Sequence, residues 1–98
     1  MNAAEVIAVL RRHEAELRRR GVEHAALFGS AARGQARAGS DLDIMVDIDP
    51  EARVDLYAYV GITQFIADLF PVPVDVAERE ALIDRVRATA ERDAVYAF

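Results

Sequence analysis

The chain has 98 residues, enough for one compact domain, and 53% of them are apolar, which excludes disorder. It contains no cysteine, so disulfides and thiolate metal sites are excluded, and a reducing compartment suits it. The net charge of −5 divides into +3 over residues 1–40 and −8 over residues 41–98, which argues against a general nucleic-acid-binding surface and allows cation binding. We expect a single soluble, cytoplasmic domain over residues 1–98.

The first predicted helix begins after Asn2, with Glu5 as the partner in a capping box, and ends at Gly21. Its apolar stripe consists of Val6, Ile7, Leu10 and Leu17. The five arginines between residues 11 and 20 resemble a nucleic-acid-binding patch. However, acidic residues lie among them at ion-pair spacing, Glu14 with Arg18 and Glu16 with Arg20, which favours a solvated helix face.

A short strand is predicted over residues 23–28, followed by a helical turn and loop over residues 31–39. The segment 41–49 alternates with a period of two residues, which predicts a half-buried strand. One face carries Leu42, Ile44, Val46 and Ile48, and the other carries Asp41, Asp43, Met45 and Asp47.

The second half of the chain predicts a helix over residues 53–69, a strand over 72–77 and a helix over 79–92. The uncharged run 56–67 is too short to span a membrane. Pro73 predicts that the 72–77 strand lies at an edge of the sheet or begins there. The apolar side of the last helix is expected to comprise Leu82, Ile83 and Val86. The order indicates an α+β fold, a small mixed β-sheet with helices on one face and the other face open.

The apolar C-terminal tail, with Val95, Tyr96 and Phe98, either packs on the first helix or binds a partner. We favour packing, because terminal apolar residues usually need cover.

Asp41 and Asp43 are two residues apart on a predicted strand, so both carboxylates leave the same face. A hard divalent cation between them removes their mutual repulsion, and carboxylate oxygens are ligands that Mg²⁺ prefers. If the strand with Asp75 is the neighbour, a third carboxylate joins the pair. Three carboxylates suit a two-metal site for an in-line displacement. Alternatively, exposed aspartates simply solvate a strand.

Gly29 and Ser30 follow a strand and precede a helical turn, a position where free backbone N–H groups and a hydroxyl bind anions. Together with the carboxylates they predict a site for a nucleoside triphosphate with Mg²⁺. Arg33 either contacts the phosphates or fixes the loop by bonding backbone carbonyls, and Ser40 is expected to cap or orient Asp41. The chain has no P-loop or G-x-G-x-x-G sequence, which excludes those two nucleotide-binding folds.

These residues resemble a known family. The segments G29-S30-A31-A32-R33-G34, S40-D41-L42-D43-I44-M45-V46 and V74-D75-V76 are similar to the minimal nucleotidyltransferases of the DNA polymerase beta superfamily. The resemblance implies that Ser30 binds the triphosphate, that Asp41 and Asp43 hold two Mg²⁺ ions, and that Asp75 completes the catalytic metal site. Position 31, often Arg in that family, is Ala here.

The resemblance also implies a partner. Members of this family are usually encoded beside a HEPN-domain toxin, and as antitoxins they transfer AMP from ATP to a tyrosine of that toxin. We therefore expect a Mg²⁺-dependent adenylyltransferase antitoxin that binds neither nucleic acid nor a membrane directly. Two alternatives stay open: a transferase acting on a small molecule such as an aminoglycoside, and a non-catalytic antitoxin that acts by binding alone.

Overall fold

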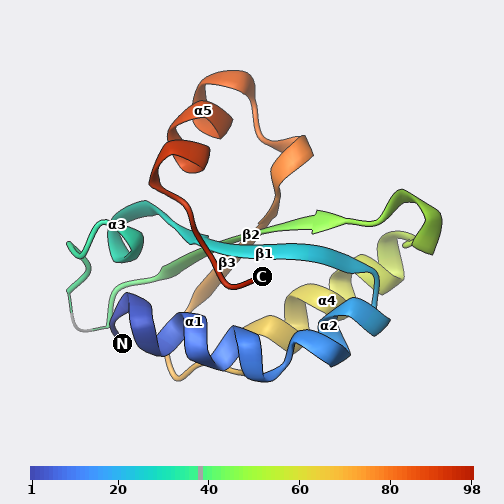
Figure 1. Cartoon of the computed structure of the whole chain (residues 1–98), viewed down its shortest axis with the longest axis horizontal. Helices are drawn as coiled ribbons and strands as arrows, with labels where there is room; N and C mark the ends of the chain where they lie inside the picture. The colour runs from blue at the N-terminus through green and yellow to red at the C-terminus, as the bar shows by residue number, and fades with distance from the viewer. Residues whose placement is uncertain (38) are drawn as a thin grey trace.

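A computed structural model describes residues 1–37 and 39–98 of the chain (Figure 1). Its helices are α1 (Ala3–Arg12), α2 (Glu14–Arg19), α3 (Gly29–Ala32), α4 (Leu56–Ala67) and α5 (Asp84–Asp93), with 3₁₀ turns η1 (Pro50–Ala52) and η2 (Arg79–Ala81). Its strands are β1 (Val22–Phe28), β2 (Leu42–Ile48), β3 (Val74–Glu78) and β4 (Val95–Tyr96). Over these described residues, each helix is too short or too polar to cross a membrane.

The four strands form one mixed sheet in the order β3-β2-β1-β4. β1 is antiparallel to both β2 and β4, whereas β2 and β3 run parallel. β3 is an edge strand, as Pro73 predicted. The main core lies between one face of the sheet and helices α1, α2 and α4, which Figure 1 shows below the sheet. That face carries the predicted apolar set, with Leu42, Ile44 and Val46 buried.

The N-terminal helical segment begins as predicted but contains a break. The Asn2 Oδ1 atom accepts a hydrogen bond from Glu5 N at 2.8 Å, and Asn2 N donates to Glu5 Oε1 at 3.1 Å, so the capping box is complete. The predicted single helix is divided at His13, whose backbone leaves the helical region and whose Nδ1 lies 2.9 Å from Val9 O. A local side-chain hydrogen bond here competes with continuation of the helix.

The arginines of the N-terminal helices are largely paired. The predicted ion pairs are present, Arg18 with Glu14 at 2.7 Å and Arg20 with Glu16 at 3.0 Å. Arg19 also contacts Glu16, at 2.5 Å. These pairs are exposed and add little stability. They do show why the segment is a solvated face, as expected, and not an unneutralised basic patch.

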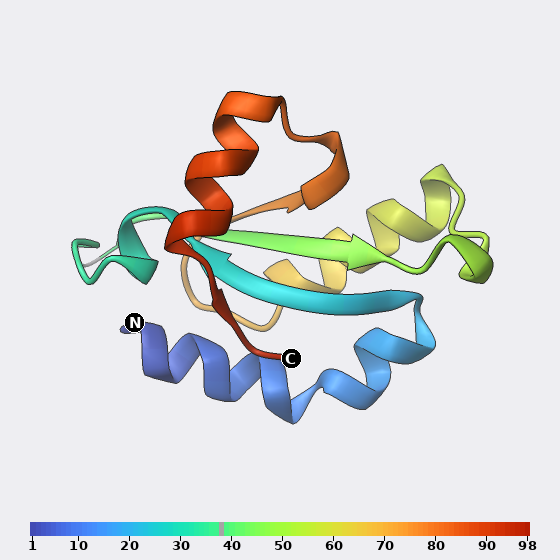
Figure 2. The same cartoon turned by 45° about the horizontal axis from the view of Figure 1, so that its top comes forward.

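The second face of the sheet is not open, and this corrects the prediction. Figure 2 shows α5 standing on the side of the sheet opposite α1. There Ala90 packs with Ala26 and Met45, all at most 2% exposed. The apolar side expected for this helix is only partly correct: Leu82 packs against this cluster, but Ile83 and Val86 are 63% and 39% exposed. Residues 79–81 form η2 and the α-helix begins only at residue 84, which changes the side that faces the sheet.

The predicted turn and loop over residues 31–39 begins earlier than expected, since α3 starts at Gly29. Ala38, within that range, lies outside the described residues.

The C-terminal tail packs on the first helix, as favoured from the sequence. β4 pairs with β1, and Ala97, which follows it, is buried. Arg11 Nε donates a hydrogen bond to Ala97 O at 2.8 Å. The Arg18 guanidinium carbon lies 4.9 Å from the centre of the Phe98 ring. The end of the chain therefore joins the sheet to both N-terminal helices.

Deleting residues 94–98 should lower the free energy of unfolding by roughly 2–3 kcal/mol, because it exposes core surface and removes a hydrogen bond. For a chain of this size the melting temperature should fall by about 10 °C or more. Tyr57→Ala is the control, because Tyr57 lies on α4 outside the tail, is 88% exposed and should matter little. Thermal unfolding of the two variants by circular dichroism would contradict the packing role if both matched the parent.

Candidate functional site

Three aspartates lie at one end of the sheet, on the face opposite the main core. Asp43 and Asp75 are direct neighbours in the parallel pairing of β2 with β3. Strands in a sheet are about 4.8 Å apart, so these two side chains leave the same face side by side. Asp41 directly precedes β2 and is exposed. The sequence predicts that Asp75 joins the Asp41–Asp43 pair if its strand is the neighbour. β3 is that neighbour, so this prediction is confirmed.

The electrostatics of Asp43 reflect this crowding. Burial raises the pKa of the Asp43 carboxyl above its usual value, and the negative charges of Asp75 and Asp41 raise it further. The positive charge of Arg33 acts in the opposite direction. The metal-free carboxylates thus repel one another across a partly desolvated surface, and a cation placed among them would relieve that repulsion.

The Gly29–Ser30 turn lies against the same carboxylate. β1 ends at Phe28, which pairs directly with Asp43, and Gly29 follows with φ of +74°. A Cβ atom at position 29 would collide with Asp43 Oδ2, so only glycine allows this approach. Ser30 lies in the first turn of α3, where backbone N–H groups lack helical acceptors. A turn whose backbone N–H groups lack helical acceptors therefore adjoins the aspartate cluster.

Gly29→Ala should reduce stability and displace Asp43, through both backbone strain and a collision of the new methyl group. Gly34→Ala is the comparison that has the strain without the collision. Gly34 has φ of +73° but no heavy atom within 4 Å of a Cβ built there. An alanine at either site carries the backbone strain, roughly 1–2 kcal/mol. Only Gly29→Ala also carries the collision, so its melting temperature should fall further than that of Gly34→Ala. Equal losses would show that Asp43 accommodates the added methyl group.

Arg33 is held by α5. Its Nη1 lies 2.6 Å from Asp93 Oδ2, and its Nε donates to Gln35 Oε1 at 3.1 Å. The Asp93 side chain is only 12% exposed. Of the two alternatives drawn from the sequence, this geometry matches fixing of the loop, although the partners are side chains and not backbone carbonyls. Asp93 was missed because it is 60 residues away and no local pattern marks it.

The remaining residues singled out in the sequence lie around the same turn. The local hydrogen bond predicted for Ser40 is present, but it runs backward, from Arg37 N to Ser40 Oγ at 3.0 Å, and not to Asp41. Ala31 is buried and belongs to the main core, which leaves no room there for the arginine common in the similar family. The loop before β2 is therefore closed by Ser40.

The donor set fits a hard divalent cation. All three candidate ligands are carboxylates, and Asp43 and Asp75 adjoin. Burial raises the pKa of Asp43 most, and the charges of Asp75 and Asp41, which a cation would offset, raise it further. Within residues 1–37 and 39–98, no three His, Cys, Asp or Glu side chains lie close enough together to hold a metal ion by themselves. The arrangement is that of a site which an ion and its anionic ligand would complete together, as is usual for Mg²⁺.

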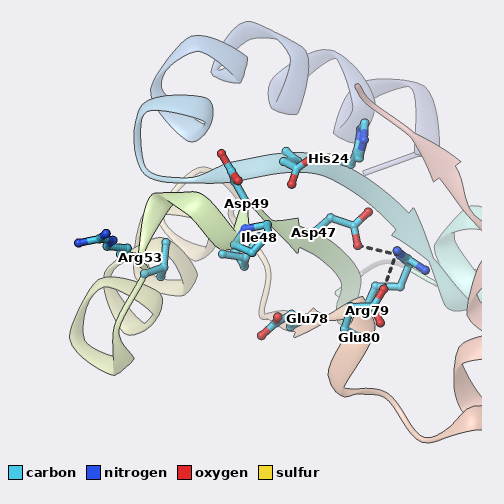
Figure 3. A pocket seen from close by; sticks show the side chains of 11 residues that line it. His24, Asp47, Ile48, Asp49, Arg53, Glu78, Arg79 and Glu80 are labelled. Atoms are coloured by element: carbon cyan, nitrogen blue, oxygen red, sulfur yellow. Dashed lines mark hydrogen bonds and ion pairs between the residues drawn. The ribbon is translucent and has the colours of Figure 1, made fainter.

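Two cavities border the outer face of the sheet. One, of about 320 Å³, lies between α3 and α5 and includes Gly29 and Arg33 in its lining. The other, of about 710 Å³, lies at the far end of β2 around Asp47 (Figure 3). There Arg79 pairs with Asp47 at 2.7 Å and with Glu80 at 2.9 Å. Neither lining includes Asp41, Asp43 or Asp75, but the smaller cavity includes Gly29, which adjoins Asp43, so the candidate site lies at the α3 end.

Comparisons with known proteins identify the family and the fold. The nucleotidyltransferase domain family matches residues 10–97. A protein adenylyltransferase named MntA from Thermococcus cleftensis is 33% identical over 93 residues, covering 94% of this chain and 92% of the relative. A solved structure assigned to the minimal nucleotidyltransferases superposes with a TM-score of 0.80 at 28% identity, covering 97% of this chain and 95% of that one.

A second solved structure shares the fold at lower identity. It is a toxin–antitoxin crystal structure with AMP-PNP, with a TM-score of 0.69 at 20% identity, covering all of this chain and 73% of that one. The family match covers residues 10–97, a range that contains the Gly-Ser turn and all three aspartates, and the Thermococcus relative is similar over 94% of the chain. The chain therefore belongs to the nucleotidyltransferase domain family and is a nucleotidyltransferase.

Proposed function

We propose that this chain is a Mg²⁺-dependent protein adenylyltransferase and the antitoxin of a toxin–antitoxin pair, transferring AMP from ATP to a tyrosine of a HEPN-domain toxin. The observation that carries the proposal is the junction of Gly29, Asp43 and Asp75. Pairing in the sheet sets the two carboxylates side by side, and the glycine backbone touches one of them. A metal–triphosphate complex requires a site for the anion directly beside a site for the cation.

The choice of protein substrate is supported by the relatives. The Thermococcus relative is itself named a protein adenylyltransferase, and solved structures of the same fold are toxin–antitoxin complexes. The similarity covers 94% of this chain and 92% of that relative.

The proposed roles follow the positions of the residues. Ser30 and the backbone around Gly29 bind the phosphates, while Asp41, Asp43 and Asp75 hold two Mg²⁺ ions. When bound, such ions neutralise charge on the transferring phosphate and lower the pKa of the attacking hydroxyl. The tyrosine oxygen forms a bond to the α-phosphorus, the bond to the bridging oxygen breaks, and pyrophosphate leaves with the electron pair. The hydroxyl proton is released to solvent.

The test is incubation of the purified chain with ATP labelled at the α-phosphate, Mg²⁺, and the toxin encoded by the neighbouring gene. We expect label on the toxin, at a tyrosine located by mass spectrometry, and no label when EDTA is added. Asp43→Asn is the inactive control, and Glu51→Gln, an exposed carboxylate far from the cluster, is the matched neutral change. Neutralisation of the toxin without labelling would contradict the proposal and favour an antitoxin that acts by binding alone.

A further inference from the structure

The cavity between α3 and α5 has a distinctive lining. Besides Gly29 and Phe28 at the end of β1, it is formed by one side of α5. The α5 residues of this lining are spaced about one helical turn apart, which places them on a common stripe facing α3. They are Arg85, Val86, Thr89, Ala90 and Asp93. The cavity therefore extends from the Gly-Ser turn along the length of α5.

The two arginines that line this cavity differ in their ion pairing. Arg33 is neutralised by Asp93 at 2.6 Å. On α5 itself, Arg87 pairs with Asp84, and Arg92 lies 3.8 Å from Asp93. Among the residues that the structure describes, Arg85 takes part in none of these ion pairs. Its guanidinium is the cation of this cavity that is free to bind an added anion.

The net charge of the cavity lining also favours binding of an anion. The cavity lining has two arginines and one aspartate, a net charge of +1, in a chain whose net charge is −5. Arg85 is exposed, so its guanidinium is accessible to an anion that enters the cavity. Gly29 and Arg85 line the same cavity of about 320 Å³, so an anion held at Gly29 can extend toward the Arg85 guanidinium.

We propose that Arg85 is a ligand of the terminal phosphates of the nucleotide, and that α5 thereby selects a triphosphate over a monophosphate. The inference rests on the proposed function, because it requires a nucleotide at the Gly29–Ser30 turn. Arg33 then has a positioning role, since its ion pair with Asp93 joins α3 to α5 and sets the width of the cavity. A planar guanidinium suits bidentate contact with phosphate oxygens.

The test is isothermal titration of the full chain and its variants with a non-hydrolysable ATP analogue and with AMP, both with Mg²⁺. Arg85→Gln should weaken binding of the ATP analogue roughly ten- to hundredfold, as expected for a lost hydrogen bond between charged groups, and should leave AMP binding unchanged. Arg85→Lys should keep part of the affinity. The matched control is Arg12→Gln on α1, across the sheet, which removes the same charge from an exposed site.

The outcomes separate this inference from the proposed function. If the parent chain binds neither nucleotide, the proposed function fails. If the parent binds the ATP analogue and Arg85→Gln binds it equally well, only the role of Arg85 is overturned. Equal weakening toward ATP analogue and AMP would place Arg85 at the nucleoside and also overturn it. Unchanged nucleotide binding with weaker toxin binding would assign Arg85 to the protein partner instead.

Discussion

Asp43→Asn should abolish the stabilisation of the chain by Mg²⁺–ATP and should raise its melting temperature when metal is absent. In the parent, a ligand at 100 times its Kd adds about 2.7 kcal/mol to the free energy of unfolding. For a domain of this size that corresponds to about 10–20 °C. The variant loses a ligand of the proposed metal site, so this increment should disappear.

The opposite effect in EDTA follows from the pKa of Asp43. Burial, Asp75 and Asp41 all raise it, so the folded protein binds this proton more tightly than the unfolded chain does. The contribution of Asp43 to stability is therefore greatest below the pKa of the unfolded carboxyl and is lost as the pH rises through the folded pKa. At neutral pH the native state carries an unfavourable charge, which asparagine removes.

Melting curves in EDTA between about pH 3.5 and 7.5 measure this directly. The difference in melting temperature between Asp43→Asn and the parent should grow with pH over this range. Glu51→Gln makes the same charge change at an exposed site and should give a nearly flat difference. A variant that melts below the parent at neutral pH in EDTA would show that Asp43 stabilises the fold in another way.

The sequence predicts the strand that carries the first two aspartates because the relevant information is local. Alternation over residues 41–49 determines which side chains share a face, and the capping box of Asn2 with Glu5 marks the first helix in the same way. The pairing of Asp43 with Asp75 is different. It depends on which strands become neighbours and in what register, and this is decided by packing of the whole domain.

Met45 is an exception to the alternation of apolar and polar residues over 41–49. It lies on the polar face among aspartates, and an apolar side chain there is a signal that something covers the strand. The covering element is α5, through Ala90. Its true start at residue 84 could not be read from periodicity, because residues 79–81 form a separate turn whose Arg79 binds Asp47 on β2. Contacts between distant segments, such as Arg33 with Asp93, leave no local trace.

Asp75→Asn should keep Mg²⁺–ATP binding within a few-fold of the parent while AMP transfer to the toxin falls by roughly 10³ or more. Asp75 is exposed on the edge strand β3, outside Asp43, whereas Gly29 touches Asp43 from the β1 side. The triphosphate therefore lies toward β1, and the acceptor hydroxyl approaches from β3. An interaction with that hydroxyl acts in the transition state and contributes little to nucleotide binding.

Two measurements on one preparation separate these roles: titration with a non-hydrolysable ATP analogue, and transfer of radiolabel to the toxin. Lowering the pKa of a bound hydroxyl by several units accounts for a loss of this size, since each unit corresponds to about 1.4 kcal/mol. Asp68→Asn, an exposed change at the end of α4, should alter neither quantity. Near-normal transfer by Asp75→Asn would make Asp75 a solvated strand residue. Loss of nucleotide binding together with transfer would mean that Asp75 holds the ion that binds the triphosphate, as Asp41 and Asp43 do, because only a residue confined to the acceptor side can lower the rate and spare the affinity.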